Sequence, residues 1–195
     1  VYNGNRIKTY KEEKGNPKTL LGRTVRRICG NGKGGIYVLT MSGVSKFDMK
    51  TDTFTHIADR QKDWITAITY CNGKLYLGTY GKLFERDEAT GVQVPYCTFP
   101  GQVLPNCLLK DVSGRCWIGS YNDGLYVMNP EGKEEKHLFP GTYIYNLYQD
   151  SGGDVWVCMW DNGLYRISAN GQTTHYRREA GSMNCISDNS IREDR

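Results

Sequence analysis

The chain has 195 residues and a formal net charge of +4, and its lysines and arginines are spread along the sequence. A nucleic-acid surface needs concentrated positive charge, so we expect no nucleic-acid partner. No stretch approaches the roughly twenty apolar residues of a membrane span, and the first residues lack the basic start and apolar core of a signal peptide.

The composition, with 23 glycines and 14 tyrosines, suits short strands that are joined by many tight turns. Only two adjacent basic pairs occur, Arg26-Arg27 and Arg177-Arg178, and neither extends into a longer run. We therefore interpret the basic residues as side chains on the solvated faces of strands.

A five-residue pattern occurs four times along the chain, at residues 36–40, 75–79, 116–120 and 155–159. Each copy is an apolar run with an aromatic residue at its second position, and these residues are Tyr37, Tyr76, Trp117 and Trp156. They are 39, 41 and 39 positions apart. Such regular spacing indicates a repeated structural unit of about forty residues.

Each repeat has the same internal order, which is clearest in the third and fourth copies. An apolar run at 106–111 or 145–150 precedes a Gly-containing turn and the aromatic strand. A second turn at 122–124 or 161–163 leads to a third strand at 125–128 or 164–167, and a weaker fourth strand falls near 136–139 or 173–176. Asn-Gly and Asp-Gly turns favour hairpins, and apolar residues alternate by two rather than by three and four. Four short antiparallel strands per repeat predict a blade of a β-propeller.

The predicted fold is therefore all-β, a β-propeller with four consecutive four-stranded blades and a partial blade at each end. Residues 1–20 are expected to end a preceding blade. Residues 21–62, 63–101, 102–140 and 141–182 are expected to form the four blades, and residues 183–195 the first strand of a following blade. We favour a fragment of a larger ring, because four blades and two stubs leave apolar faces uncovered. The alternative is a compact five-bladed ring that the two end segments complete together.

The seven cysteines form no C-x-x-C pair and no cluster with histidine, so neither a zinc site nor a cofactor is expected. Cys116 takes a repeat position that Ile36, Leu75 and Val155 fill elsewhere, and we interpret it as a small buried hydrophobic residue. For the other cysteines we favour the same interpretation over disulfides.

The two best-preserved repeats resemble the two-component-regulator propeller family. Residues 150–157 read Asp-Ser-Gly-Gly-Asp-Val-Trp-Val and are followed by Asn-Gly-Leu-Tyr-Arg at 162–166, and residues 111–120 with 123–126 follow the same pattern. The other two repeats have Tyr37 and Tyr76 in place of tryptophan, and the fourth has Cys158-Met159 where Gly-Thr is expected.

This resemblance implies a segment of the periplasmic sensor region of a hybrid two-component system of Bacteroides type. Such a sensor binds a carbohydrate breakdown product and signals through a membrane helix to a histidine kinase. The expected partners are an oligosaccharide or other small ligand, the rest of the propeller and its membrane-linked kinase, and a second copy in a homodimer. The segment itself is not expected to be an enzyme.

A ligand site is predicted on the face that carries the loops between second and third strands and the links between blades. Aromatic residues recur in these loops beside amide and carboxylate groups that suit a sugar's C–H faces and hydroxyls. The predicted ligand-binding residues are Tyr80, Tyr121, Trp160, Asn122, Asp123, Asp161, Asn162, Trp64 and Tyr145, with Asn106 and Tyr143 nearby. The alternative is that the polar residues only make turns and the aromatic residues only cover neighbouring blades.

Two other functions are alternatives to ligand sensing. A propeller lactonase or lyase needs catalytic groups near the ring axis, whereas His56, His137 and His175 fall near the outermost strands. Asn106, Asn146 and Asn189 recur near the starts of first strands, where oxygen ligands for Ca²⁺ would gather, although turn formation or channel hydration explains them better. A propeller that docks a partner polypeptide on its aromatic face is the remaining alternative.

Overall fold

The computed structural model describes residues 7–99, 102–182 and 185–189, and every strand in these ranges belongs to one of four antiparallel sheets. Blade 1 contains β1 (Val25–Gly30), β2 (Gly35–Thr40), β3 (Gly43–Asp48) and β4 (Thr53–Asp59), and blade 2 contains β5 (Ile65–Cys71), β6 (Lys74–Thr79), β7 (Lys82–Asp87) and β8 (Gln93–Thr98). Blade 3 contains β9 (Pro105–Lys110), β10 (Cys116–Ser120), β11 (Leu125–Met128) and β12 (Glu134–Leu138), and blade 4 contains β13 (Ile144–Gln149), β14 (Val155–Met159), β15 (Leu164–Ile167) and β16 (Thr173–Tyr176). Within these ranges no helix is long and apolar enough to cross a membrane.

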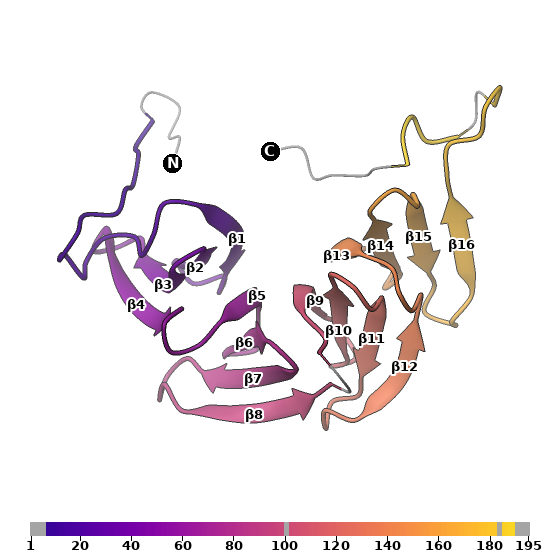
Figure 1. Cartoon of the computed structure of the whole chain (residues 1–195). Coiled ribbons are helices and arrows are strands. Elements are labelled where there is room, and N and C mark those ends of the chain that lie inside the picture. The colour runs from indigo at the N-terminus through magenta and orange to yellow at the C-terminus, as the bar shows by residue number, and fades with distance from the viewer. Residues whose placement is uncertain (1–6, 100–101, 183–184, 190–195) are drawn as a thin grey trace.

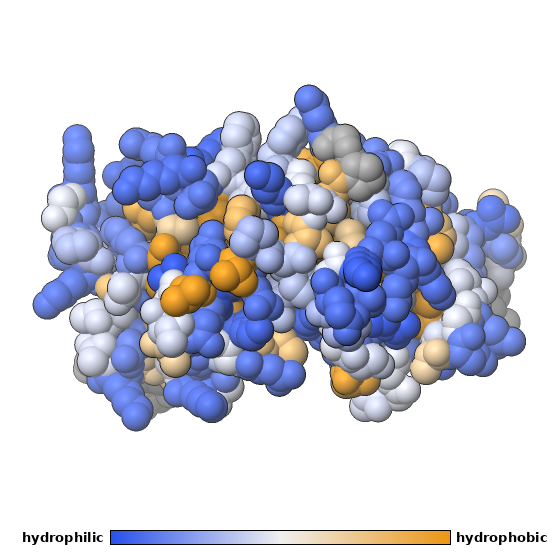
Figure 2. Space-filling model, turned by 90° about the horizontal axis from the view of Figure 1, so that it is seen from below, coloured by the Kyte–Doolittle hydropathy of each residue, from blue (hydrophilic) through white to orange (hydrophobic). Residues whose placement is uncertain are grey.

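The four blades stand side by side in an arc (Figure 1). The first strand of each blade lies toward the centre and the fourth strand lies on the outer rim. The arc is open between blade 1 and blade 4, so the described residues do not close a ring. This arrangement confirms the all-β prediction and the four consecutive four-stranded blades of an incomplete propeller. Seen from the outer rim, the surface is largely hydrophilic, with separate apolar areas (Figure 2).

The repeated aromatic residues take equivalent places in the second strands of the blades. Trp117 Nε1 donates a hydrogen bond of 2.8 Å to Asp111 Oδ2, and Trp156 Nε1 donates one of 2.7 Å to Asp150 Oδ2. In blade 1 the phenol of Tyr37 instead donates to Glu88 in blade 2. In blade 1 the acceptor of the repeated aromatic residue therefore lies in the next blade.

The core lies mainly between neighbouring blades. One cluster joins Leu39 of blade 1 to Leu77 of blade 2, a second joins Leu83 to Ile118 of blade 3, and a third joins Leu125 to residues of blade 4. All five side chains are fully buried. Each blade is thus stabilised largely by burial of apolar surface against its neighbours.

The glycine of the Gly-Ser pair in β10 permits one of these close contacts. A Cβ atom at Gly119 would lie 2.5 Å from Cys107 Sγ and 2.6 Å from Ile144 Cγ2. Ile144 is the first residue of the next blade, so a side chain at position 119 would push blades 3 and 4 apart.

The turn after each second strand is tied to the segment that leads into the next blade. Gly81 N donates to Val103 O at 2.9 Å, Gly124 N to Thr142 O at 2.8 Å, and Gly163 N to Asn189 O at 2.8 Å. All three glycines have a φ near +70°, which the predicted hairpin turns require. The loops between second and third strands and the links between blades therefore share one face, as predicted.

The two end segments were predicted to be partial blades. Tyr10 packs its ring 4.9 Å from Phe47 and 5.6 Å from Phe54, and Leu20 joins the same apolar cluster on blade 1. Residues 1–6 of the first partial blade lie outside the described residues, as do residues 183–184 and 190–195 of the last one. The exact domain boundaries stay predictions.

All seven cysteines are free, and Cys116 is fully buried in the cluster between blades 2 and 3. Burial raises the pKa of its thiol, so the side chain stays neutral and packs as a small hydrophobic group. The prediction for Cys116 is confirmed.

Candidate functional site

A β-bulge occurs at the second residue of the innermost strand in all four blades. The pairing between first and second strands skips one residue between Val25 and Arg27, and it skips one at the same point in the other three blades. The skipped residues are Arg26, Thr66, Asn106 and Tyr145. A bulge bends the strand and redirects the side chain of the extra residue. The fold therefore presents one redirected side chain per blade near the ring axis.

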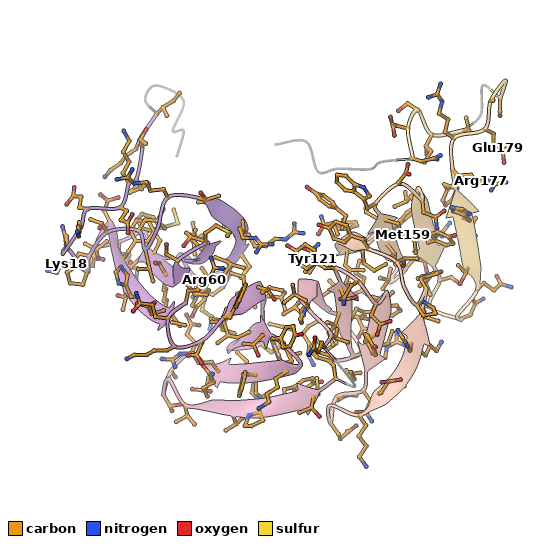
Figure 3. All side chains as sticks on the ribbon, in the orientation of Figure 1. Lys18, Arg60, Tyr121, Met159, Arg177 and Glu179 are labelled. Carbon is orange, nitrogen blue, oxygen red and sulfur yellow. The ribbon has the colours of Figure 1, made fainter. Side chains whose placement is uncertain are left out.

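All four bulge residues line one cavity of about 200 Å³. Arg27, Tyr121 and Tyr143 complete its lining. Figure 3 places Tyr121 at the centre of the arc, in the space between β1 and β9. We call the cavity of about 200 Å³ the axial cavity. It receives residues from all four blades, although they are far apart in the sequence.

Three tyrosines of blades 3 and 4, Tyr121, Tyr143 and Tyr145, line the axial cavity, and Trp160 packs against two of them from outside this lining. The rings of Tyr121 and Tyr143 stack at a centroid distance of 5.1 Å, and Tyr143 stacks on Trp160 at 5.8 Å. Tyr145 contacts Trp160 at 6.2 Å. Burial raises the pKa of the Tyr143 hydroxyl, which therefore stays protonated and can donate a hydrogen bond. We call these four residues the aromatic wall.

Two arginines reach the aromatic wall from blade 1. The guanidinium carbon of Arg26 lies 5.6 Å from the ring centroid of Tyr121, and that of Arg27 lies 5.9 Å from the ring centroid of Tyr145. Arg27 Nη2 also donates a hydrogen bond of 2.7 Å to Tyr145 O. Both arginines are half-buried, so the interpretation of this pair as a solvated strand face is wrong. Contacts with the rings and the carbonyl bring them inward.

Asn106 joins blades 3 and 4 at the floor of the site. Its Nδ2 donates to Ile144 O at 2.9 Å and to Tyr145 O at 3.0 Å, and the side chain is buried. Asn146 is not equivalent to Asn106, because it follows the bulge of its strand and pairs with Cys158. In the part of the chain that the structure describes, no group of three or more His, Cys, Asp or Glu side chains could hold a metal ion.

A second, larger hollow of about 660 Å³ runs along the inner strands. Arg26 and Arg27 line both spaces, and the hollow also contacts Ile68, Asn146 and Tyr148. The two spaces therefore adjoin at the arginine pair, and a ligand longer than the axial cavity has room to extend along the axis.

The predicted polar residues of the loops have structural roles in their turns. Asp123 accepts a hydrogen bond from the Tyr126 hydroxyl, and its backbone nitrogen donates to Ser120 Oγ at 2.8 Å. Asp161 has a φ of 59°, and Asn162 Nδ2 contacts Met159 Sδ at 3.5 Å. Asn122 is exposed. None of these four predicted residues lines the axial cavity, and a ligand role for them stays a prediction.

Trp64 and Tyr80 lie on blade 2, outside the lining of the axial cavity. Trp64 is 57% exposed and has the Arg60 guanidinium 4.7 Å from its ring centroid, and Tyr80 is 50% exposed. The structure thus brings Tyr121, Tyr145 and Trp160 together from the predicted set, along with Asn106 and Tyr143. Blade 2 contributes Thr66 instead, which the sequence interpretation missed.

The three histidines lie on the outermost strands β4, β12 and β16, as predicted. His137 stacks on Tyr126 at 4.1 Å, and His175 stacks on Tyr165 at 3.9 Å. Their Nε2 atoms contact the backbone oxygens of Asp123 and Asn162 in the turns. They brace the turns of their blades on the outer rim.

Arg26, Arg27 and Thr66 are the site residues that the sequence interpretation missed. If the four inner strands are aligned on their second residue, Arg26 and Thr66 fall at the same position as Asn106 and Tyr145. The sequence alone does not reveal this alignment, because it depends on a bulge that interrupts the alternation by two and is not marked by a particular residue type.

Comparison with known proteins agrees with this architecture. A sequence model of the family described as "Two component regulator propeller" matches residues 138–161, which cover the link between blades 3 and 4 with β13 and β14. The match confirms the resemblance of the repeats to this family. No curated protein sequence matches the chain significantly.

Solved structures share the propeller fold at low sequence identity. One is described as the extracellular domain of a hybrid two component system, BT3049, from B. thetaiotaomicron, with 23% identity and a TM-score of 0.72 over 94% of this chain and 25% of that one. The corresponding domain of BT4673 from the same organism has 20% identity and a TM-score of 0.71 over 93% and 25%. Virginiamycin B lyase from Staphylococcus aureus has 16% identity and a TM-score of 0.66 over 81% and 57%. The chain spans about a quarter of the length of the two sensor domains.

Proposed function

We propose that this chain, which carries the two-component regulator propeller repeat, is a ligand-sensing segment of a periplasmic two-component sensor and recognises an oligosaccharide in its axial cavity. One observation carries the proposal: the bulged position of all four inner strands delivers its side chain to the same cavity. A repeat that served packing alone would have no need for a polar or aromatic group at this point in every blade.

The chemistry of the cavity supports a sugar. The aromatic wall offers flat apolar surfaces for the C–H faces of a pyranose ring, and Arg, Thr, Asn and Tyr side chains offer polar groups for its hydroxyls. Typical ligand pockets measure about 300–1,000 Å³. The axial cavity is smaller, at about 200 Å³, but the adjoining hollow of about 660 Å³ extends it. A short oligosaccharide suits these two spaces better than a monosaccharide.

The lining supports binding rather than catalysis. Among the described residues it contains no histidine, cysteine or carboxylate, and the Thr66 hydroxyl donates to Gly78 O at 3.3 Å. A general base within hydrogen-bond reach of a nucleophile is what acid–base catalysis needs. We therefore propose a non-enzymatic segment that relays ligand binding to a histidine kinase in a longer protein.

The proposed context rests on the repeat family and on the neighbours named above as extracellular domains. In that context the remaining propeller blades, a membrane-linked kinase and a second copy of the sensor are the proposed partners.

Isothermal titration of the chain with a panel of oligosaccharides tests the proposal. Tyr121→Ala should weaken binding by about tenfold or more, because it removes a ring that lines the cavity, and Trp160→Ala should weaken binding because it removes the ring that supports Tyr143 and Tyr145. Tyr80→Ala is the matched control, since Tyr80 occupies the equivalent loop of blade 2 but lies outside the cavity lining. Unchanged affinity in the Tyr121→Ala and Trp160→Ala variants, with unchanged melting temperatures, would place the ligand elsewhere. Failure of every oligosaccharide to bind would remove the sugar from the proposal.

A further inference from the structure

The axial cavity has a positive charge that the described part of the protein does not neutralise. The described residues of its lining include Arg26 and Arg27 but no carboxylate. In the described residues, no ion pair involves either of them. Two other arginines that touch aromatic rings do have carboxylate partners: Arg115 lies 2.8 Å from Asp111, and Arg166 lies 2.5 Å from Asp154.

The two arginines also disfavour each other. Partial burial lowers the pKa of Arg26, Tyr143 opposes this effect, and the neighbouring charges of Arg27 and Arg60 add to it. Two adjacent guanidinium groups that are half-buried without an anion carry a cost in desolvation and repulsion. An anionic group in the cavity would offset this cost.

The geometry leaves donors available for such a group. Arg27 uses Nη2 for the carbonyl of Tyr145, and a guanidinium has five N–H donors in a planar fork. Such a fork matches a carboxylate or sulfate with paired hydrogen bonds. The rings of Tyr121 and Tyr145 support the two guanidinium groups beside the aromatic wall.

We infer that the ligand of the axial cavity is an acidic oligosaccharide, whose carboxylate or sulfate group binds Arg26 and Arg27 while a sugar ring packs on the aromatic wall. This inference rests on the proposed function and names the class of its ligand. The arginine pair supplies the selectivity, and the aromatic wall supplies the affinity that acidic and neutral sugars share.

Calorimetric titration with matched sugars tests the inference. The probes are trigalacturonate and trimannuronate, their carboxyl-reduced neutral counterparts, and a carrageenan disaccharide that carries sulfate without carboxylate. At least one acidic probe should bind about tenfold or more tightly than its neutral counterpart, and its affinity should fall as salt is raised. For sulfate, the desulfated disaccharide is the neutral counterpart. The acidic probe that binds more tightly identifies which anion the pair accepts.

Arg26→Gln and Arg27→Gln should each remove this preference, because affinity for the acidic probe should fall more than affinity for its neutral counterpart. Arg23→Gln is the control, since it makes the same change of charge on a side chain that is 85% exposed. Equal binding of acidic and neutral probes, with affinity still lost in Tyr121→Ala, would overturn the inference and leave the proposed function standing. Absence of binding by every probe would overturn both.

Discussion

Arg27 of blade 1 and Tyr145 of blade 4 are in contact across the centre of the arc. Arg27 Nη2 donates a hydrogen bond of 2.7 Å to Tyr145 O, and its guanidinium faces the ring of the same residue. The two residues are 118 positions apart. This contact links the first and last blades of the described arc directly through two residues that line the axial cavity.

Removal of this contact should loosen blade 4. We expect Arg27→Ala to lower the free energy of unfolding by about 1–2 kcal/mol, since a charged donor to a backbone carbonyl is lost. Amide hydrogen exchange in β13 should become faster, whereas exchange in β6 should not change. Arg23→Ala is the control. Equal exchange rates in β13 of the variant and the original chain would show that the contact does not stabilise blade 4.

Glu88 should make stability depend on acid pH. Partial burial alone would raise its pKa, but hydrogen bonds from Lys46, Tyr70, Asn31 and Tyr37 lower it from 4.5 to about 2. Because the folded-state pKa is lowered, the stabilisation is present above about pH 4.5 and is lost as the pH falls toward 2.

The variant Glu88→Gln tests this pH dependence. It should be less stable than the original chain by about 1–3 kcal/mol at pH 7, and the difference should shrink at pH 3. Urea unfolding at the two pH values measures both quantities. Glu135→Gln, on an exposed side chain, should change neither. A difference that is the same at both pH values would contradict the role of the Glu88 carboxylate.

Close packing of blades 3 and 4 depends on Gly119. We expect Gly119→Ala to lower the free energy of unfolding by about 1–3 kcal/mol, because the new Cβ meets Cys107 and Ile144 at less than 3 Å. Gly30→Ala is the control: it lies in β1, and the nearest atom to its Cβ is 3.8 Å away. Chemical denaturation measures both variants. Equal stabilities would mean that the neighbouring strands accommodate the methyl group.

The blades could be predicted from the sequence, but three of the seven residues that line the axial cavity could not. Regular spacing of Tyr37, Tyr76, Trp117 and Trp156 marks the second strands, because packing between blades demands a large residue at the same place in each repeat. Tyr121, Trp160 and Tyr145 could be grouped because their loops and links share a face.

Arg26 and Thr66 could not be identified in this way. Alternation by two assigns each residue of a strand to a face only while the pairing is regular, and a bulge reverses that assignment from one residue to the next. The contact of Arg27 with Tyr145 depends on the curvature of four assembled blades, which no local pattern of residues specifies. The turn residues Asp123 and Asp161 show a second limit of sequence patterns, since a polar residue in a loop can be required by the turn itself.

Asn106 should be important for the shape of the site. Asn106→Ala removes the donor to two backbone oxygens at the start of β13, and we expect a loss of about 1–3 kcal/mol in stability. Ligand affinity should fall as well, because the bulge that carries Tyr145 loses its support. Asn122→Ala, in an exposed turn, should stay within about 0.5 kcal/mol of the original chain. Thermal unfolding and calorimetric titration of both variants provide the comparison.

A crystal structure of the chain with the tightest-binding oligosaccharide tests the central claim most directly. The account predicts electron density for a sugar ring against Tyr121 and Tyr143, with its acidic group within hydrogen-bond distance of Arg26 or Arg27. Density for the sugar on the outer rim of the blades, with the axial cavity holding only water, would contradict it.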